Sequence, residues 1–133
     1  MEPRNVRVLV VDDQGGIRQL LQEILRSEDY DVKLASNGYE ALGVIEGFNP
    51  HIIVIDMKMP GMNGLEVIRE IKSRDIGHGV FIMMTAYGEL EIVNEAASLG
   101  VKYYINKPFD IGDLLNLIKK IHSPDGSEKL NIS

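Results

Sequence analysis

The sequence predicts an α/β domain built on a five-stranded parallel sheet, because five apolar runs alternate with five helical patterns. The clearest run is 52–55, a stretch of consecutive β-branched residues that is typical of a strand buried on both faces. Asp56 follows this run with no polar transition, and a Pro-Gly turn then leads towards a helix. We therefore expect a central strand that delivers Asp56 to one edge of the sheet.

Length and composition fit one soluble globular domain. The chain has 133 residues, of which 44% are hydrophobic and 26% are charged, enough for a single sizeable core. Its net charge of -6 offers no basic surface to nucleic acid or to an anionic membrane. The absence of cysteine excludes disulfides and thiolate metal sites, and no apolar run approaches the ~18 residues that span a bilayer. Residues 1–5 lack a signal-peptide core, so we expect a cytoplasmic protein.

The first half of the chain supplies three strands and two helices. Strands are expected over 6–11, 30–35 and 51–55, the second being short with alternating polarity. A helix opens at 15–16, where apolar residues then recur at the spacing of one helical face. These residues are Ile17, Leu20, Leu21, Ile24 and Leu25. Asn37 followed by Glu40 resembles a capping box and predicts a second helix that ends near Gly47.

The second half repeats the alternation. Helices are expected over 64–73, over 89–99 and from Asp110 onward, with strands over 80–84 and 101–105. Acidic residues begin the helix over 89–99, where the helix dipole favours them, and Gly100 is suited to end it. The last helix has an apolar face made of Leu114, Leu117, Ile118 and Ile121.

The order of these elements predicts a (βα)5 three-layer sandwich. Right-handed crossovers leave few arrangements, of which the flavodoxin-like strand order 2-1-3-4-5 is the commonest at this size. The domain is expected over 5–122, and 123–133 is expected to be a polar tail or the start of an interdomain linker.

Polar residues follow four of the five predicted strands. Asp12 and Asp13 follow the first strand, Asp56 the third, Thr85 the fourth, and Lys107 comes just after the fifth. The carboxyl ends of parallel strands meet at one edge of the sheet, which is where open α/β folds place their chemistry. We therefore expect these five side chains to lie together.

Such a set favours phosphoryl transfer onto a carboxylate. Three neighbouring carboxylates repel one another unless a cation sits among them, and hard oxygen ligands favour Mg²⁺, with Mn²⁺ as a second choice. The cation and Lys107 would neutralise the phosphoryl oxygens, Thr85 would donate a hydrogen bond, and Asp56 would attack in line. The product would be an acyl phosphate on Asp56.

Two enzyme-like alternatives fit less well. Haloacid-dehalogenase-type phosphatases place a second aspartate two residues after the nucleophile, but this chain has Lys58 there. A flavodoxin needs a phosphate cradle rich in Ser, Thr and Gly after the first strand, where Asp12 and Asp13 would repel a phosphate. Neither alternative therefore explains the site well, and we do not expect an enzyme.

With these residues in place, the chain resembles the receiver domains of two-component response regulators over residues 5–122. The resemblance implies that Asp56 takes a phosphoryl group from a phosphohistidine on a partner, a sensor histidine kinase. It implies that Asp13, Asp56 and the backbone carbonyl of Lys58 bind Mg²⁺, with Asp12 acting mainly through water.

The resemblance also assigns the response to phosphorylation. Thr85 and Lys107 would contact the phosphoryl group, and Tyr104 would be the aromatic switch residue that moves inward as Thr85 is drawn to the phosphate. The Lys107–Pro108 peptide bond is commonly cis in this family.

Four segments resemble more closely the single-domain phosphorelay regulators of sporulating bacteria, which pass a phosphoryl group to a histidine phosphotransferase. These segments are 11–18, 56–62, 84–90 and 107–111. The chain departs at Tyr104, where those regulators have His, and at Gly15, where they have an aromatic residue. The alternative is the receiver module of a transcriptional regulator whose effector domain is absent from this chain. We expect a monomer or a phosphorylation-dependent dimer, and dimerisation is how the regulator module would act.

Two further groups of residues have a functional and a structural interpretation. Lys58 and Tyr87 lie two residues after Asp56 and Thr85, where they either shield an acyl phosphate from water and slow its decay, or are ordinary exposed loop residues. The second group could form an apolar patch that binds the helices of a histidine-bearing partner. Packing in the core explains the periodicity of its residues on the first helix equally well. The residues assigned to this partner surface are Ile17, Leu20, Tyr87, Pro108 and Phe109.

Overall fold

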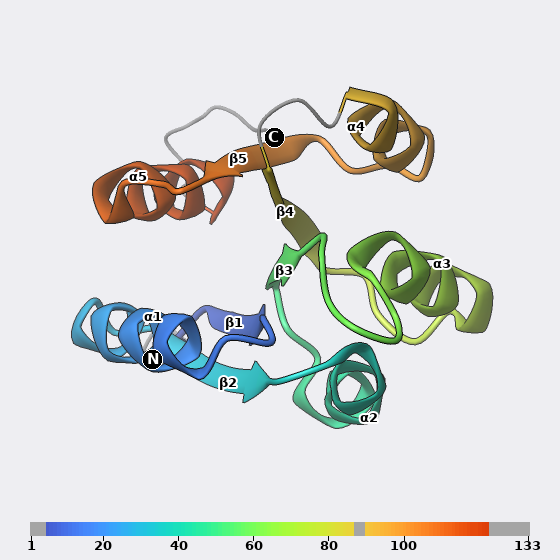
Figure 1. The fold of residues 1–133 in the computed structure, drawn as a ribbon. Coiled ribbons are helices and arrows are strands. Elements are labelled where there is room, and N and C mark those ends of the chain that lie inside the picture. The colour runs from blue at the N-terminus through green and yellow to red at the C-terminus, as the bar shows by residue number, and fades with distance from the viewer. Residues whose placement is uncertain (1–4, 87–89, 123–133) are drawn as a thin grey trace.

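The protein is a three-layer α/β sandwich in a computed structural model that describes residues 5–86 and 90–122 (Figure 1). The parallel sheet has the order β2-β1-β3-β4-β5, which confirms the predicted fold class. The strands are β1 (Arg7–Val11), β2 (Asp31–Ala35), β3 (Ile52–Asp56), β4 (Val80–Ala86) and β5 (Tyr103–Lys107). The helices are α1 (Gly15–Ser27), α2 (Gly38–Phe48), α3 (Gly64–Arg74), α4 (Leu90–Ser98) and α5 (Ile111–His122). The expected tail over 123–133 lies outside the described residues.

The sheet separates two hydrophobic cores. Helices α1 and α5 cover one face, and α2, α3 and α4 cover the other (Figure 1). Alternate residues of each strand feed the two cores, and all four apolar residues of β3 are fully buried, as their β-branched character predicts. None of the described helices has both the length and the apolar character needed to span a bilayer. The central strands are therefore clamped from both sides, which fixes the residues at their carboxyl ends.

Helix ends follow the capping chemistry of the sequence, with one correction. The Asn37 side chain accepts from the Glu40 N–H, as predicted, but the Glu40 carboxylate accepts from the N–H and the hydroxyl of Ser36. The complete capping box lies instead at Asn63 and Glu66, where each side chain accepts from the other residue's N–H. This box fixes the start of α3 directly after the loop that follows β3.

The last two strands extend further towards the carboxyl edge than predicted. Pairing of Thr85 with Asn106 and of Ala86 with Lys107 places both Thr85 and Lys107 inside strands. The expected strand over 101–105 begins two residues late, because the Val101 N–H donates to the Ala96 carbonyl and closes the end of α4. The predicted first residue of that helix, Glu89, lies outside the described residues.

Candidate functional site

Three carboxylates meet at the carboxyl edge of the sheet. Asp12 follows β1 and is fully buried, Asp56 ends β3 and is 5% exposed, and Asp13 is exposed. One oxygen from each lies within 4.8 Å of the others. Buried carboxylates are unusual unless a cation or hydrogen-bond donors compensate them. The structure thus brings together the three acidic residues that the sequence singled out.

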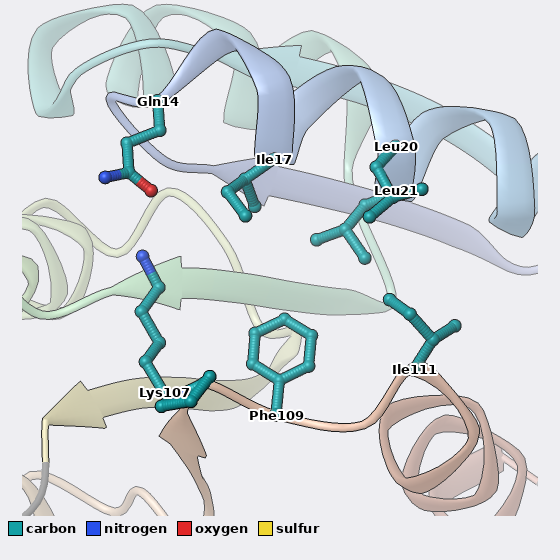
Figure 2. A pocket seen from close by; sticks show the side chains of 8 residues that line it. Gln14, Ile17, Leu20, Leu21, Lys107, Phe109 and Ile111 are labelled. Carbon is teal, nitrogen blue, oxygen red and sulfur yellow. The ribbon is translucent and has the colours of Figure 1, made fainter.

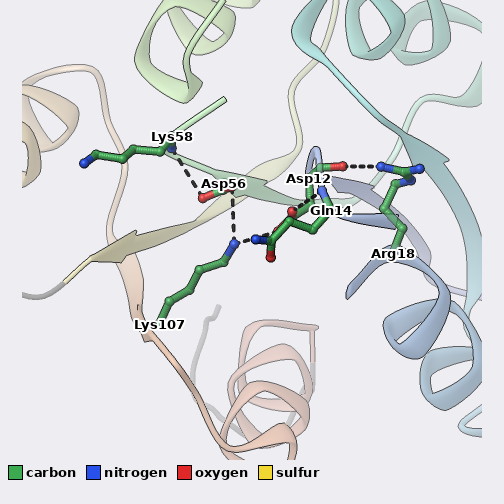
Figure 3. A network of polar contacts seen from close by, with 6 residues as sticks. All are labelled: Asp12, Gln14, Arg18, Asp56, Lys58 and Lys107. Atoms are coloured by element: carbon green, nitrogen blue, oxygen red, sulfur yellow. Dashed lines mark hydrogen bonds and ion pairs between the residues drawn. The ribbon is translucent and has the colours of Figure 1, made fainter. Parts of the chain in front are cut away.

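Lys107 supplies the compensating charge. Its Nζ lies 2.9 Å from Asp12 Oδ2 and 3.2 Å from Asp56 Oδ2, reaching from β5 past β4 to the two buried carboxylates (Figure 3). The lysine side chain is 25% exposed, so the ammonium is partly withdrawn from water. The Lys107–Pro108 peptide bond is cis, as the resemblance implies. A fixed cation therefore stands beside the proposed phosphoacceptor.

Asp12 is held by residues that the sequence analysis did not single out. Its Oδ1 accepts from the Gln14 N–H at 2.9 Å, and its backbone carbonyl accepts from Arg18 Nη1 at 2.7 Å (Figure 3). Its own N–H donates to the Ala35 carbonyl. Because the backbone and the side chain of Asp12 both form hydrogen bonds, Oδ2 is presented to Lys107 in a defined position.

The environment shifts the acid–base behaviour of Asp56 and Lys107. Burial, together with the charge of Asp12, raises the pKa of Asp56, although Lys107 and the Lys58 N–H oppose this. Burial lowers the pKa of Lys107, but the hydrogen bond with Asp12 and the charges of Asp56 and Asp12 outweigh it, so the pKa is raised overall. Lys107 therefore stays charged beside a carboxylate that is poorly solvated.

The loop after β3 packs closely on Asp56. The Lys58 N–H donates to Asp56 Oδ1 at 3.3 Å, while the Lys58 side chain is exposed and extends away from the carboxylates (Figure 3). The Gly64 N–H donates to the Met57 carbonyl, and a Cβ on Gly64 would lie 2.8 Å from the Asp56 carbonyl oxygen. Only glycine lets α3 begin this close to Asp56.

The two residues assigned to the response lie on the other side of the site. Thr85 is 2% exposed, and its hydroxyl donates to Asn106 Oδ1 at 3.1 Å. The Tyr104 hydroxyl is 2.9 Å from the Val101 carbonyl and 3.2 Å from the Val93 carbonyl, and its ring packs in the core beneath α4. Tyr87 lies outside the described residues. Thr85 and Tyr104 thus both have hydrogen-bond partners away from the carboxylates.

The donor set fits a hard divalent cation. Asp12, Asp13 and Asp56 offer carboxylate oxygens only, with no nitrogen or sulfur ligand among them. Oxygen ligands of this kind suit Mg²⁺, and Mn²⁺ can replace it. Lys107 engages Oδ2 of both Asp12 and Asp56, and Asp12 Oδ1 accepts from the Gln14 N–H at 2.9 Å. The exposed Asp13 and Asp56 Oδ1, whose bond from the Lys58 N–H is longer at 3.3 Å, are therefore better placed for a cation.

An apolar cavity of about 380 Å³ lies beside the carboxylates, between α1 and the segment that joins β5 to α5 (Figure 2). Ile17, Leu20, Pro108 and Phe109 all line it, and Lys107 and Gln14 lie at one end. Leu20 is 44% exposed, whereas Leu21 on the same helix is buried. Four of the five residues predicted for a partner surface are thus brought together, and they share Lys107 with the acidic site.

Comparison with known proteins agrees with this architecture. The family model for the response regulator receiver domain matches residues 8–119. The chain belongs to the response regulator receiver family. It is 42% identical over 116 residues to sporulation initiation phosphotransferase F of Bacillus subtilis, covering 87% of this chain and 93% of that protein. It is 37% identical over 112 residues to the regulatory protein AtoC of Escherichia coli, covering 84% of this chain but 24% of that protein.

Solved receiver structures share the fold. Chemotaxis protein CheY4 of Vibrio cholerae has a TM-score of 0.83 and 28% identity to this receiver, covering 89% of this chain and 99% of that chain. A receiver domain protein from Methanospirillum hungatei has a TM-score of 0.81 and 34% identity, covering 88% and 93%. These comparisons confirm the resemblance drawn from the sequence, and they make the receiver a signalling module of the two-component type.

Proposed function

We propose that this receiver accepts a phosphoryl group on Asp56 from a phosphohistidine of a sensor histidine kinase, and acts as a switch or phosphorelay carrier. The observation that supports this best is the position of Lys107, whose Nζ bridges the buried carboxylates of Asp12 and Asp56. A buried carboxylate beside a fixed cation can receive a dianionic group, because much of the added negative charge is already opposed.

The transfer itself needs little covalent chemistry from the protein. An Asp56 oxygen attacks phosphorus in line, the P–N bond of the phosphohistidine breaks, and its electron pair returns to the imidazole, which takes a proton from solvent. Lys107 opposes the charge on the phosphoryl oxygens, Asp12 keeps Lys107 in place, and the Thr85 hydroxyl donates to one oxygen once it is free. Asp13, Asp56 and the Lys58 carbonyl would hold Mg²⁺, with Asp12 acting through water. The bound cation supplies positive charge beside the phosphoryl oxygens.

The apolar cavity is the proposed docking surface for the partner. Ile17 on α1 faces Phe109 across it, Leu20 also lines it, and Lys107 links it to Asp56 (Figure 2). A helix that seats an apolar side chain between them would place a histidine from its next turn near the phosphoacceptor. A sensor kinase and a histidine phosphotransferase could both present such a helix, which is what a carrier requires. With its net charge of -6, the receiver would work in the cytoplasm without contacting nucleic acid or membrane.

The test is intact mass after incubation with Mg²⁺ and acetyl phosphate, beside an Asp56→Asn control and a control without Mg²⁺. We expect the wild-type protein to gain one phosphoryl group and both controls to gain none. Failure of the wild-type protein to gain it, even from a histidine-phosphorylated donor, would overturn the proposal. Following the decay tests the shielding role of Lys58 and Tyr87: loss over hours would support it, whereas rapid loss would remove that role and leave the receiver.

A second candidate is the receiver module of a transcriptional regulator, because the chain matches only 24% of the length of AtoC. Such a module would act by dimerising when phosphorylated. Light scattering with and without beryllofluoride and Mg²⁺ distinguishes the two functions. A monomer in both states supports the carrier, and a dimer that forms only with beryllofluoride supports the regulator module.

A further inference from the structure

The hydroxyl of Thr85 already has a partner on the neighbouring strand. Thr85 and Asn106 are directly paired residues of β4 and β5, and Thr85 Oγ1 donates to Asn106 Oδ1 at 3.1 Å. Thr85 is 2% exposed, whereas Asn106 lies at the exposed end of β5. Asn106 therefore acts on a buried hydroxyl from a position that is itself open to solvent.

This hydrogen bond excludes the one that Thr85 would make to a phosphoryl group. A hydroxyl has a single proton to donate, so Thr85 can donate either to Asn106 or to a phosphoryl oxygen at any moment. Thr85 directly follows Met84, which pairs with Asp56 across β3 and β4, so the residue lies one position beyond the phosphoacceptor on the adjacent strand. Redirecting the hydroxyl towards Asp56 requires the bond to Asn106 to break.

We propose that Asn106 is a positioning residue that holds Thr85 in the unphosphorylated arrangement and so sets the threshold for the response. The proposal rests on the proposed function of Asp56. When the bond to Thr85 breaks, the exposed Asn106 amide is solvated by water. Asn106 therefore stabilises the unphosphorylated arrangement by the free energy of one net hydrogen bond. Asn106 and Lys107 are successive residues of β5, so their side chains point to opposite faces of the sheet. Lys107 engages the carboxylates and Asn106 engages the residue that responds.

The alternative is that the pair only ties the exposed ends of β4 and β5 together. In that case, removing Asn106 would change stability but not the binding of a phosphoryl mimic. If Asn106 acts through Thr85, its removal should change binding only while the Thr85 hydroxyl is present. A double-mutant cycle separates these two cases.

The experiment measures the affinity of the full chain for beryllofluoride in the presence of Mg²⁺ by calorimetry. Asn106→Ala is compared with wild type, and the same substitution is made in a Thr85→Ala background. Asn116→Ala on the exposed side of α5 is the matched control. The methyl shift of Thr85 in the free protein gives a readout that requires no ligand.

We expect Asn106→Ala to bind beryllofluoride about three- to tenfold more tightly than wild type, the range of one net hydrogen bond. It should have no effect in the Thr85→Ala background, Asn116→Ala should bind like wild type, and the free Thr85 methyl shift should move towards its bound position. Unchanged or weaker binding by Asn106→Ala overturns the proposal, as does an equal gain in both backgrounds. If the wild-type protein neither binds beryllofluoride nor takes a phosphoryl group, the proposed function fails, and this inference fails with it.

Discussion

The two sides of the carboxyl edge of the sheet are built differently. On the side of β1 and β3, the strands are almost wholly buried, and Asp12 and Asp56 are fixed by Lys107 and by backbone donors. On the side of β4 and β5, the last strand is only half-buried, and Ala96 is the single buried residue of α4. The side of β1 and β3, which we call the acceptor side, thus has its charged residues held by several contacts, whereas the side of β5 and α4, which we call the responsive side, has less buried surface.

This contrast suits the proposed switch, because accepting a phosphoryl group and responding to it need opposite properties. A phosphoacceptor must be preorganised, since its charges act only if they are already in place when the phosphoryl group arrives. A responding surface must have two arrangements that differ by only a few kcal/mol. Hydrogen bonds of single hydroxyls, such as those of Thr85 and Tyr104, are of that scale.

Replacing Lys107 should have the largest effect, because it removes the positive charge beside Asp12 and Asp56. In Lys107→Met the two buried carboxylates face each other without their partner, so we expect phosphorylation by acetyl phosphate to slow by about 10²-fold. We also expect a loss of about 3 kcal/mol in the free energy of unfolding at neutral pH. Lys102→Met, an exposed lysine just before β5, is the control. A wild-type phosphorylation rate in Lys107→Met would show that the carboxylates need no fixed cation.

A methyl group between β3 and α3 should have the next largest effect. A Cβ on Gly64 would meet the Asp56 carbonyl at 2.8 Å, so Gly64→Ala should push α3 away and lower the free energy of unfolding by about 1–3 kcal/mol. Gly43→Ala on α2 is the matched control, because a Cβ there meets nothing within 4 Å. Chemical denaturation should show that Gly43→Ala gains about 0.5–1 kcal/mol, the usual difference between glycine and alanine inside a helix.

Most of the acceptor side could be predicted from the sequence, but the ends of β4 and β5 on the responsive side could not. Runs of β-branched residues predict buried strands. The order of the elements then predicts that Asp12, Asp56 and Lys107 meet at the carboxyl edge of the sheet. The ends of β4 and β5 depend on their mutual register, which residue type does not encode. Because Val101 closes the end of α4, β5 also begins later than predicted, and the predicted strand over 101–105 stopped one residue before Asn106.

The supporting residues were missed for a related reason. Gln14 acts through its backbone N–H and Arg18 through a bond to the Asp12 carbonyl, and neither contact depends on a motif. Asn106 looks in the sequence like any polar residue at the end of an edge strand. The sequence did contain a signal for the start of α3. Asn63 and Glu66 have the same spacing as Asn37 and Glu40, to which the capping box was assigned.

The acceptor side should also carry a cost in stability that pH can reveal. Because the pKa of Asp56 is raised in the folded protein, folding favours its protonated form, and stability falls as pH rises from the ordinary carboxyl range through that raised value. The raised pKa already includes the attraction of Lys107. Asp56→Asn carries no such charge, so we expect it to be more stable than wild type at neutral pH by about 1 kcal/mol.

Thermal unfolding of both proteins between acidic and neutral pH checks this. The advantage of Asp56→Asn should shrink as pH falls and Asp56 becomes protonated. An advantage that is the same at every pH would mean that the amide improves packing and that the buried charge carries no cost.

The smallest effect should come from the responsive side. Tyr104→Phe removes the hydroxyl that lies within hydrogen-bond distance of the Val93 and Val101 carbonyls, so α4 loses one tie to β5. We expect a global loss of only about 0.5–1 kcal/mol. Amide exchange should accelerate in α4 and leave β1 and β3 unchanged, because α4 can open without the central strands. Tyr103→Phe, whose ring packs in the opposite core, is the control. Equal acceleration in β3 would show that the two sides open as one unit, and the contrast between them would then be one of burial alone.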